Sequence, residues 1–510
     1  MMAGTAVRYV LIAVGVIIAY EIVRGLVLSM LKSRLSRSAR EYIQSNRVRL
    51  DKYKFMNRVV IKHELMNDPD INREIIAHAG EKDTSIREVR NRVEDYIEEI
   101  VPFFNLLSYY KIGYWFANFL LNLIYEVVID HENAEKLKKI PDNSVVVFVM
   151  NHRSNIDYIL VAYMLARQIS LSYAVGEWAR VWPLEYIFKS FGAYFIRRQY
   201  RERLYHLVLE KYIQLISLQG VTQGIFIEGG LTRDGRFRKA KVGILDYIIR
   251  IRKNPDFTGE LVFVPASINY DWVLEDNVLV QEWQKGRKKS GPIEKAGSLF
   301  RITVRGPVMV MRNITRYFTG RLKHHGYASV SFSDPVFLSD LLKKEKTDIF
   351  RMERYDRLSR VQGFADSLLH SIGQVIPVTP VCLLSFVLAK AGAGELQRNI
   401  ILTELARVRG ILRERGCRIV TGKAFEPGKS SMDRLENEKS TRKKELVSFE
   451  EEFLGSEEAA EIMSIGMDLL KRRRIITVRG DLVVINKKKR PLLEYYAHSV
   501  EHLVPQSGGH

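Results

Sequence analysis

The sequence predicts a layered α/β fold in which a mixed, largely parallel sheet is flanked by helices, with further helical regions toward both termini. Between about residues 145 and 336, short β-rich runs alternate with runs whose apolar residues return every three or four positions. The β-rich runs are almost continuously apolar, which is typical of strands buried on both faces. The predicted strands cover residues 145–150, 193–197, 224–227, 261–268 and 328–332, and the helices between them cover 158–168, 202–219 and 240–251.

These patterns divide the chain into four regions. Residues 1–40 are predicted to form a membrane-associating helix, and residues 41–140 a helical region with an interfacial apolar stretch. The α/β domain is expected at residues 141–340. Residues 341–510 are predicted to form a mainly helical C-terminal region that contains a basic hairpin.

The composition limits the classes of protein and of partner that fit this chain. The 510 residues include 79 Lys and Arg against 59 Asp and Glu, a formal net charge of +20, and 46% of them are apolar. Such a chain can bury a large core, so disordered and fibrous classes are excluded. Two cysteines, Cys382 and Cys417, cannot form a disulfide framework and favour a reducing compartment. The excess positive charge favours anionic partners.

The N-terminal region contains an apolar run at residues 10–20 that resumes at 25–31 after Glu21 and Arg24. The combined length approaches the roughly 20 residues needed to cross a bilayer, although charges inside a membrane are costly. Basic residues come after it in place of a cleavage site, which disfavours a secretory signal and favours a cytoplasmic location for the rest of the chain. We expect a cell-membrane protein whose main domain faces the cytoplasm. The segment either spans the membrane or lies along it, and a buried helix is the alternative.

Three later segments carry weaker signals. Residues 101–129 are rich in aromatic side chains and suit either a membrane interface or a helical hairpin under the main domain. Residues 375–389 are too short for a membrane span and favour a buried or interfacial helix. Basic clusters at 471–474 and 487–490 bracket a predicted hairpin at 475–485, which indicates a contact surface for an anionic partner.

The strongest chemical signal lies just after the strand at residues 145–150. His152 comes directly after this strand, and the carboxyl ends of strands in open α/β sheets are where ligands bind. Asp157 can reach His152 only if the histidine sits in the turn before the next helix. In that arrangement Asp157 would fix the imidazole tautomer so that the other ring nitrogen can remove a proton from a hydroxyl. Ser154 and Asp157 also match a helix-capping pattern, which gives Asp157 a structural alternative.

Two adjacent arginines, Arg197 and Arg198, end the strand predicted at residues 193–197. Neighbouring strand residues point to opposite sides, so one of them can face the ligand crevice. The rigid donor fork of arginine suits phosphate. The structural alternatives are an exposed strand end or an ion pair with Glu185 or Glu202.

Two further segments lie at or just after predicted strands. Glu228, Gly229 and Gly230 come directly after a buried strand, and Arg233 opens a run of cations. The glycines permit close approach of the backbone to a ligand, although a tight turn would explain them equally well. Pro265 interrupts the strand at 261–268, which indicates an edge, a bulge or a pocket rim.

The order of these four segments resembles the glycerol-3-phosphate acyltransferase branch of the glycerolipid acyltransferase family, over roughly residues 145–338. Four motifs in this order are strong evidence, whereas any one alone is weak. In one departure, Leu231 stands where the third motif of the family usually has arginine. The motifs are the H-x4-D segment from His152 to Asp157, the segment 192–198 that ends in Arg197-Arg198, Glu228-Gly229-Gly230 with Arg233, Gly235 and Arg236, and Val264-Pro265 with Tyr270-Asp271.

The resemblance implies an acyltransferase-type domain that moves an acyl group to the first hydroxyl of glycerol-3-phosphate, giving lysophosphatidic acid. It implies that His152 is the general base and that Asp157 orients it. Because a thioester is already activated, no nucleophilic serine or cysteine is needed. The residues that the resemblance assigns to substrate binding are Arg197, Arg198, Glu228, Gly229, Gly230, Arg233 and Pro265.

The expected partners are glycerol-3-phosphate, an acyl donor that is acyl-CoA or acyl carrier protein, and anionic membrane lipid. No metal is expected, because the histidines outside the first motif lack a recognisable ligand spacing. No cofactor is expected, and no nucleic acid, since a nucleic-acid-binding scaffold would leave the four motifs unexplained. One alternative keeps the chemistry and changes the acceptor to dihydroxyacetone phosphate or lysophosphatidic acid. Another is a noncatalytic basic scaffold that binds nucleic acid or anionic lipid.

Overall fold

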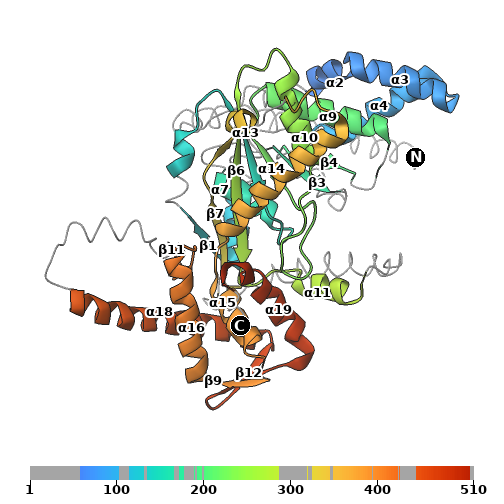
Figure 1. The fold of residues 1–510 in the computed structure, drawn as a ribbon. Coiled ribbons are helices and arrows are strands. Elements are labelled where there is room, and N and C mark those ends of the chain that lie inside the picture. Colours follow the sequence, from blue (N-terminus) through green and yellow to red (C-terminus); the bar gives the residue numbers. More distant parts are fainter. Residues whose placement is uncertain are drawn as a thin grey trace, which may run out of the picture.

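The computed structural model has an eight-stranded sheet at its centre (Figure 1). Five neighbouring strands run parallel in the order β6-β2-β5-β3-β4, while β7 and β8 are antiparallel to β6 and β1 is parallel to β7. The predicted mixed, largely parallel sheet is therefore confirmed. The strands are β1 (Glu126–Ile129), β2 (Ser144–Met150), β3 (Ser172–Gly176), β4 (Tyr194–Ile196), β5 (Gln223–Phe226), β6 (Glu260–Tyr270), β7 (Tyr327–Phe332) and β8 (Val336–Phe337).

The structure describes residues 58–102, 114–130, 135–165, 172–176, 192–197, 202–286, 324–344, 348–392, 394–422, 424–425 and 444–505, together with residues 189, 200 and 319. The N-terminal apolar runs at 10–20 and 25–31 lie outside these ranges. Among the described residues, no helix combines the length and the apolar character that a membrane crossing requires.

The central strand β2 shows why the sheet is buried on both sides. All seven of its residues are buried. Because side chains alternate along a strand, Val145, Val147 and Val149 enter one hydrophobic core, and Val146, Phe148 and Met150 enter another. Two cores require helices on both faces of the sheet.

Helices from the N-terminal half and from the α/β domain supply most of this cover. The first core contains buried residues of α2–α4, α9, α10 and α14, whereas the second contains α5 and α7. The helices are α2 (Arg58–Met66), α3 (Pro69–Lys82), α4 (Ile86–Ile100), α5 (Tyr114–Ile124), α7 (Asp157–Leu165), α9 (Arg203–Leu218), α10 (Gly243–Ile249), α11 (Asp276–Gln284), α13 (Leu338–Lys344) and α14 (Arg354–Gln374).

The C-terminal helices from residue 380 onward pack where β6 ends, and Figure 1 shows them gathered at that end of the sheet, whereas α14 packs against β6 and β2. Residues 381–388 of α15 are all buried, which confirms a buried helix in the predicted 375–389 segment. The predicted hairpin at 475–485 is also present, and Gly480 turns it with a φ of 58°. The elements are α15 (Pro380–Lys390), β9 (Glu395–Gln397), α16 (Arg398–Glu414), β10 (Val420–Thr421), β11 (Ala424–Phe425), α18 (Lys444–Arg472), β12 (Ile476–Arg479), β13 (Leu482–Ile485) and α19 (Arg490–His498).

Two sequence expectations need correction. The sheet begins before the predicted boundary at residue 141, because β1 pairs with β7. Pro265 lies in an interior strand, where β6 pairs with β2 on one side and with β7 and β8 on the other. It falls opposite the break between β7 and β8, and its carbonyl accepts from Ser333 N on that side at 2.9 Å. The N–H and C=O of a strand residue point the same way, so the missing N–H faces this break.

Candidate active site

The loop between β2 and α7, residues 151–156, begins where β2 leaves the sheet; we call it the histidine loop. The Asn151 side chain donates to Ile268 O at 2.9 Å and accepts from Ile268 N at 2.8 Å. Its amide group therefore replaces one step of the β2–β6 ladder after the strand has ended. This pairing fixes the point at which the chain leaves the sheet, just before His152.

His152 and Asp157 meet as the sequence predicted. His152 Nδ1 lies 2.9 Å from Asp157 Oδ2. The same oxygen accepts from Arg153 N at 2.7 Å and Ser154 N at 3.0 Å, so the carboxylate also shapes the turn before α7. Tyr270, the last residue of β6, donates its hydroxyl to Asp157 Oδ1 at 2.6 Å. Asp157 combines the orienting and the capping roles that the sequence left as alternatives.

The imidazole of His152 is held in an aromatic setting. Its ring stacks on Phe226 with the centroids 4.3 Å apart. The Tyr158 hydroxyl lies 3.4 Å from Nε2. With Nδ1–H directed to the Asp157 carboxylate, Nε2 carries the lone pair and can accept a proton. His152 is 2% exposed, so bulk water has little access to this nitrogen.

Glu228 is buried beneath the histidine loop. Its two carboxylate oxygens accept from His152 N at 3.0 Å and from Arg238 N at 2.7 Å. Burial raises the pKa of Glu228 to about 7, although both backbone donors and the nearby Arg153 act to lower it. In this structure Glu228 ties the histidine loop to the loop after β5.

The paired glycines after Glu228 form a tight turn. Gly229 N donates to Phe226 O at 2.9 Å, and Gly229 has a φ of 64°. A Cβ there would lie 2.9 Å from the Lys241 side chain. Gly230 is next to it along the chain. The loop then returns under the histidine, where Thr232 N donates to His152 O at 3.2 Å.

One of the predicted phosphate-binding arginines, Arg197, lies on a different part of the sheet from His152. Arg197 directly follows β4, which is separated from β2 by β5 and β3, or about 14 Å at ~4.8 Å per strand. Both sides of its guanidinium contact Glu99 of α4, with Nε 2.7 Å from Oε1. Glu99 is the partner, in place of the Glu185 or Glu202 that the sequence suggested. Arg233 is about half exposed and pairs with Glu282 of α11 at 2.9 Å. Arg198 lies outside the described residues.

Sequence reasoning missed Glu275, which lies at the start of α11. Glu275 Oε2 accepts from the Ser154 hydroxyl at 2.7 Å, and Oε1 accepts from Asn155 N at 3.2 Å. Tyr270 also escaped notice as a residue that contacts Asp157. Both act across more than 110 residues of chain. The dipeptide Tyr270-Asp271, at the end of an apolar strand, was the one local sequence pattern that could have pointed to these residues.

Comparisons with known proteins show which families the chain resembles. A family model described as Acyltransferase matches residues 129–269, and one described as Glycerol-3-phosphate acyltransferase C-terminal region matches residues 311–506. A glycerol-3-phosphate acyltransferase of Actinobacillus pleuropneumoniae serotype 3 is 24% identical over 92% of this chain and 52% of its own length. One from Haemophilus influenzae strain PittEE is 25% identical over 74% of this chain and 45% of its own length. The chain spans about half the length of these curated relatives.

The chain thus carries matches to both an Acyltransferase model and a Glycerol-3-phosphate acyltransferase C-terminal region model, and it is similar to curated glycerol-3-phosphate acyltransferases. A solved 1-acyl-sn-glycerophosphate (LPA) acyltransferase from Thermotoga maritima is 16% identical, with 51% of this chain and 79% of that chain covered and a TM-score of 0.28. The resemblance to the glycerol-3-phosphate acyltransferase family rests on the two models and the sequence relatives.

The unusual Leu231 has a cation beside it. Leu231 is half-buried against the second core. Its carbonyl accepts from Arg238 Nη1 at 3.3 Å, and Arg238 N is one of the two donors to Glu228. Arg238 therefore brings positive charge to the third motif, next to the backbone of the residue where the family usually has arginine.

The raised pKa of Glu228 predicts a pH-dependent contribution to stability. Between the unfolded pKa of about 4.3 and the folded pKa of about 7, the folded protein holds a proton that the unfolded chain has released. Stability therefore falls as pH rises through this window, by about 3 kcal/mol from this group. Glu228→Gln has no such proton. We therefore expect its free energy of unfolding to rise by about 3 kcal/mol relative to that of wild type as the pH increases from about 4.5 to about 8. Urea denaturation of wild type and Glu228→Gln at both pH values measures the difference between their free energies of unfolding. A difference that does not change with pH would contradict the prediction.

Proposed function

We propose that this chain transfers an acyl group from an acyl thioester to the first hydroxyl of glycerol-3-phosphate, giving lysophosphatidic acid, with His152 as the general base. The observation that carries the proposal is the buried His152–Asp157 pair at the carboxyl end of β2, with Nδ1 and Oδ2 2.9 Å apart. A base oriented in this way activates a hydroxyl without any covalent intermediate. The matching family models and the names of the relatives supply the acyl-transfer class and the acceptor.

In the proposed reaction, His152 and Asp157 act together on the proton of the acceptor hydroxyl. His152 Nε2 takes the hydroxyl proton as the acceptor oxygen attacks the thioester carbonyl carbon, while Asp157 holds the resulting imidazolium through Nδ1–H. When the tetrahedral intermediate collapses, the carbon–sulfur bond breaks and the proton passes from His152 to the leaving thiolate. An ester and a free thiol result, and His152 is again neutral.

The nucleophiles among the described residues near His152 are poor alternatives to direct transfer. Burial raises the pKa of the Cys382 thiol, which disfavours the thiolate that a nucleophile needs, and the thiol lies 3.7 Å from Tyr270 O. The Ser154 hydroxyl donates to the Glu275 carboxylate and not to His152. Direct attack by the acceptor hydroxyl therefore needs the fewest rearrangements among the groups around His152.

Recognition of the acceptor phosphate is proposed for the cations of the second and third motifs. The Arg233–Glu282 pair is about half exposed, and such pairs contribute only about 0–1 kcal/mol, so a phosphate can displace Glu282. Arg197 is engaged by Glu99 and partly buried, which suits it better to holding α4 against β4. The family resemblance also assigns Arg198, Glu228, Gly229, Gly230 and Pro265 to this binding region, and the contacts of Glu228 favour a supporting role.

We also propose that the chain works at the cytoplasmic face of the cell membrane, with acyl-CoA or acyl carrier protein as the donor. The net charge of +20 favours anionic lipid surfaces and anionic donors. The apolar runs at residues 10–20 and 25–31 supply a membrane-associating segment.

A donor-by-acceptor matrix on the purified chain tests the proposal. Acyl-CoA and acylated carrier protein are each combined with glycerol-3-phosphate, dihydroxyacetone phosphate, lysophosphatidic acid or free glycerol. We expect lysophosphatidic acid from glycerol-3-phosphate, and a kcat/KM for free glycerol at least about 10-fold lower, because each charge-assisted bond to phosphate contributes about 1.5–3 kcal/mol. Preference for another phosphorylated acceptor would reassign the substrate. A folded chain that consumes no thioester would contradict the proposal.

A further inference from the structure

We infer that the C-terminal region positions the histidine loop through Tyr496, so that Tyr496 is a positioning residue for the proposed base. The inference rests on the proposed function and deepens it. Three groups define what we call the clamp: the Tyr496 hydroxyl, the Arg473 guanidinium and the Asp276 carboxylate. A second name, the post-β6 segment, denotes residues 271–276, which lie between β6 and the first turn of α11.

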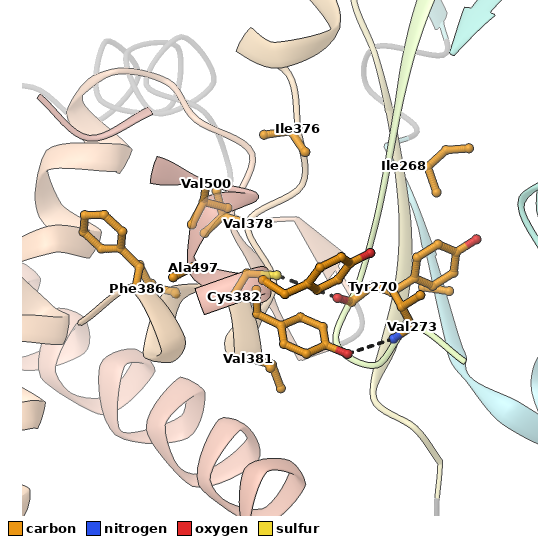
Figure 2. Close-up of a cluster of buried hydrophobic side chains, with 14 of the residues drawn as sticks. Ile268, Tyr270, Val273, Ile376, Val378, Val381, Cys382, Phe386, Ala497 and Val500 are labelled. Carbon is orange, nitrogen blue, oxygen red and sulfur yellow. Dashed lines mark hydrogen bonds between the residues drawn. The ribbon is translucent and has the colours of Figure 1, made fainter. Parts of the chain in front are cut away.

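The clamp is buried and fully connected. Arg473 Nη2 lies 2.5 Å from Asp276 Oδ2, and Arg473 Nη1 donates to the Tyr496 hydroxyl at 2.8 Å. That hydroxyl donates to Asp276 and accepts from Val273 N at 3.1 Å, the hydrogen bond drawn to Val273 in Figure 2. One hydroxyl thus makes three hydrogen bonds, which is its full capacity. Exposures of 0% for Asp276 and 1% for Tyr496 mean that water cannot replace a lost partner.

The clamp changes how the basic cluster at residues 471–474 is interpreted. Arg473 is 7% exposed, and its guanidinium lies over the Trp272 ring at 4.6 Å. This arginine is therefore removed from the electrostatic contact surface that the sequence suggested. Its charge serves the interior contact between the C-terminal region and the post-β6 segment.

The post-β6 segment carries the effect of the clamp to the histidine loop. Val273 and Asp276 are held by the clamp, and Glu275 between them binds Ser154 and Asn155. At the other end of the segment, Asp271 accepts from Val381 N of α15 at 2.8 Å. Figure 2 shows Tyr270 and Val273 beside Val381 and Cys382 of that helix. The C-terminal region therefore holds the segment at both ends, and Glu275 lies within the held stretch.

The neighbouring residue Tyr495 provides a matched control. Tyr495 lies on the same helix and is 2% exposed. Its hydroxyl has no hydrogen-bond partner among the described residues. Tyr495→Phe and Tyr496→Phe therefore remove the same atom from the same buried helix, and only the second removal breaks the clamp.

The experiment compares these two variants in the full chain by kinetics with glycerol-3-phosphate and acyl-CoA, and by amide hydrogen exchange. We expect Tyr496→Phe to lower kcat per folded molecule by about 10- to 100-fold with both KM values nearly unchanged, because a displaced base costs rate without weakening binding. Tyr496→Phe should also lose amide protection at residues 153–155. Tyr495→Phe should match wild type in both measurements.

A double-mutant cycle with Glu275→Ala separates positioning from general destabilisation. If Tyr496 acts through Glu275, the double variant should lose no more kcat than Glu275→Ala alone. Additive losses, or equal kcat and protection for the two phenylalanine variants, would overturn the inference. If Tyr496→Phe fails to fold, the Glu275→Ala variant tests the inference. Unchanged kcat and unchanged amide protection in that variant would contradict it, because Tyr496 is proposed to act through Glu275. Absent acyl transfer by wild type refutes the proposed function, while the exchange data still test the clamp.

Discussion

Replacing His152 with alanine is expected to lower kcat for acyl transfer by about 10²- to 10⁴-fold, the usual contribution of a general base. The His152 imidazole has an orienting carboxylate at Nδ1, and its other ring nitrogen, Nε2, lies 3.4 Å from the Tyr158 hydroxyl. KM for the donor should change little, because the base contacts only the hydroxyl. Steady-state rates with glycerol-3-phosphate and acyl-CoA measure the effect, corrected for the folded fraction by circular dichroism.

A second buried histidine offers the matched control. His78 of α3 lies 3.4 Å from the Glu202 carboxylate, and its side chain is 10% exposed. His78→Ala therefore removes a buried imidazole beside a carboxylate, but away from the end of β2. We expect its kcat per folded molecule to equal that of wild type. Similar losses in His78→Ala and His152→Ala would show that His152 contributes packing and not proton transfer.

Asp157 needs a conservative substitution, because it does more than orient the base. Asp157→Ala would remove the acceptor for Arg153 N, Ser154 N and Tyr270, so the histidine loop would lose its shape together with the charge. Asp157→Asn keeps one oxygen toward the loop and removes the charge. A charge-assisted hydrogen bond contributes about 1.5–3 kcal/mol, so we expect a loss of about 10- to 100-fold in kcat, measured in the same steady-state assay.

The parts of this fold that sequence predicted best are those specified locally. β2 and β6 are apolar runs buried on both faces, and the 203–218 helix repeats apolar residues at helical spacing, so pattern and structure coincide. β1 was missed because its four residues continue an apolar stretch, where period alone cannot separate strand from helix. For Pro265 the sequence left an edge, a bulge and a pocket rim as alternatives, because its interior position depends on a break in neighbouring strands far along the chain.

The site shows the same division between local and distant information. His152 and Asp157 are five residues apart, and their spacing predicted their contact. Arg197 was predicted to face a phosphate, but its partner Glu99 is 98 residues away on another helix. Likewise, Arg473 belongs to a charged run of a kind that is usually solvated, and its burial against Asp276 depends on contacts across nearly 200 residues. The charge pattern of a sequence alone does not show whether a cationic side chain faces solvent or is buried in a contact within the protein.

Gly235→Ala is expected to destabilise the protein by about 2–5 kcal/mol, from two separate causes. Gly235 has a φ of 88°, a conformation that costs a side-chain-bearing residue about 1–2 kcal/mol. An added Cβ would also lie 1.9 Å from the Tyr495 carbonyl oxygen, so α19 or the third-motif loop must move. Such overpacking costs about 1–3 kcal/mol.

Gly220→Ala separates the two causes. Gly220 has a similar φ of 75°, but no atom lies within 4 Å of its added Cβ, so only the backbone cost of about 1–2 kcal/mol should appear. Denaturant midpoints of both variants against wild type measure the difference. Because the Gly235 carbonyl accepts from Arg153, next to His152, Gly235→Ala should also reduce acyl transfer, whereas Gly220→Ala should not. Equal destabilisation by the two substitutions would mean that α19 does not pack against this loop as closely as the structure shows.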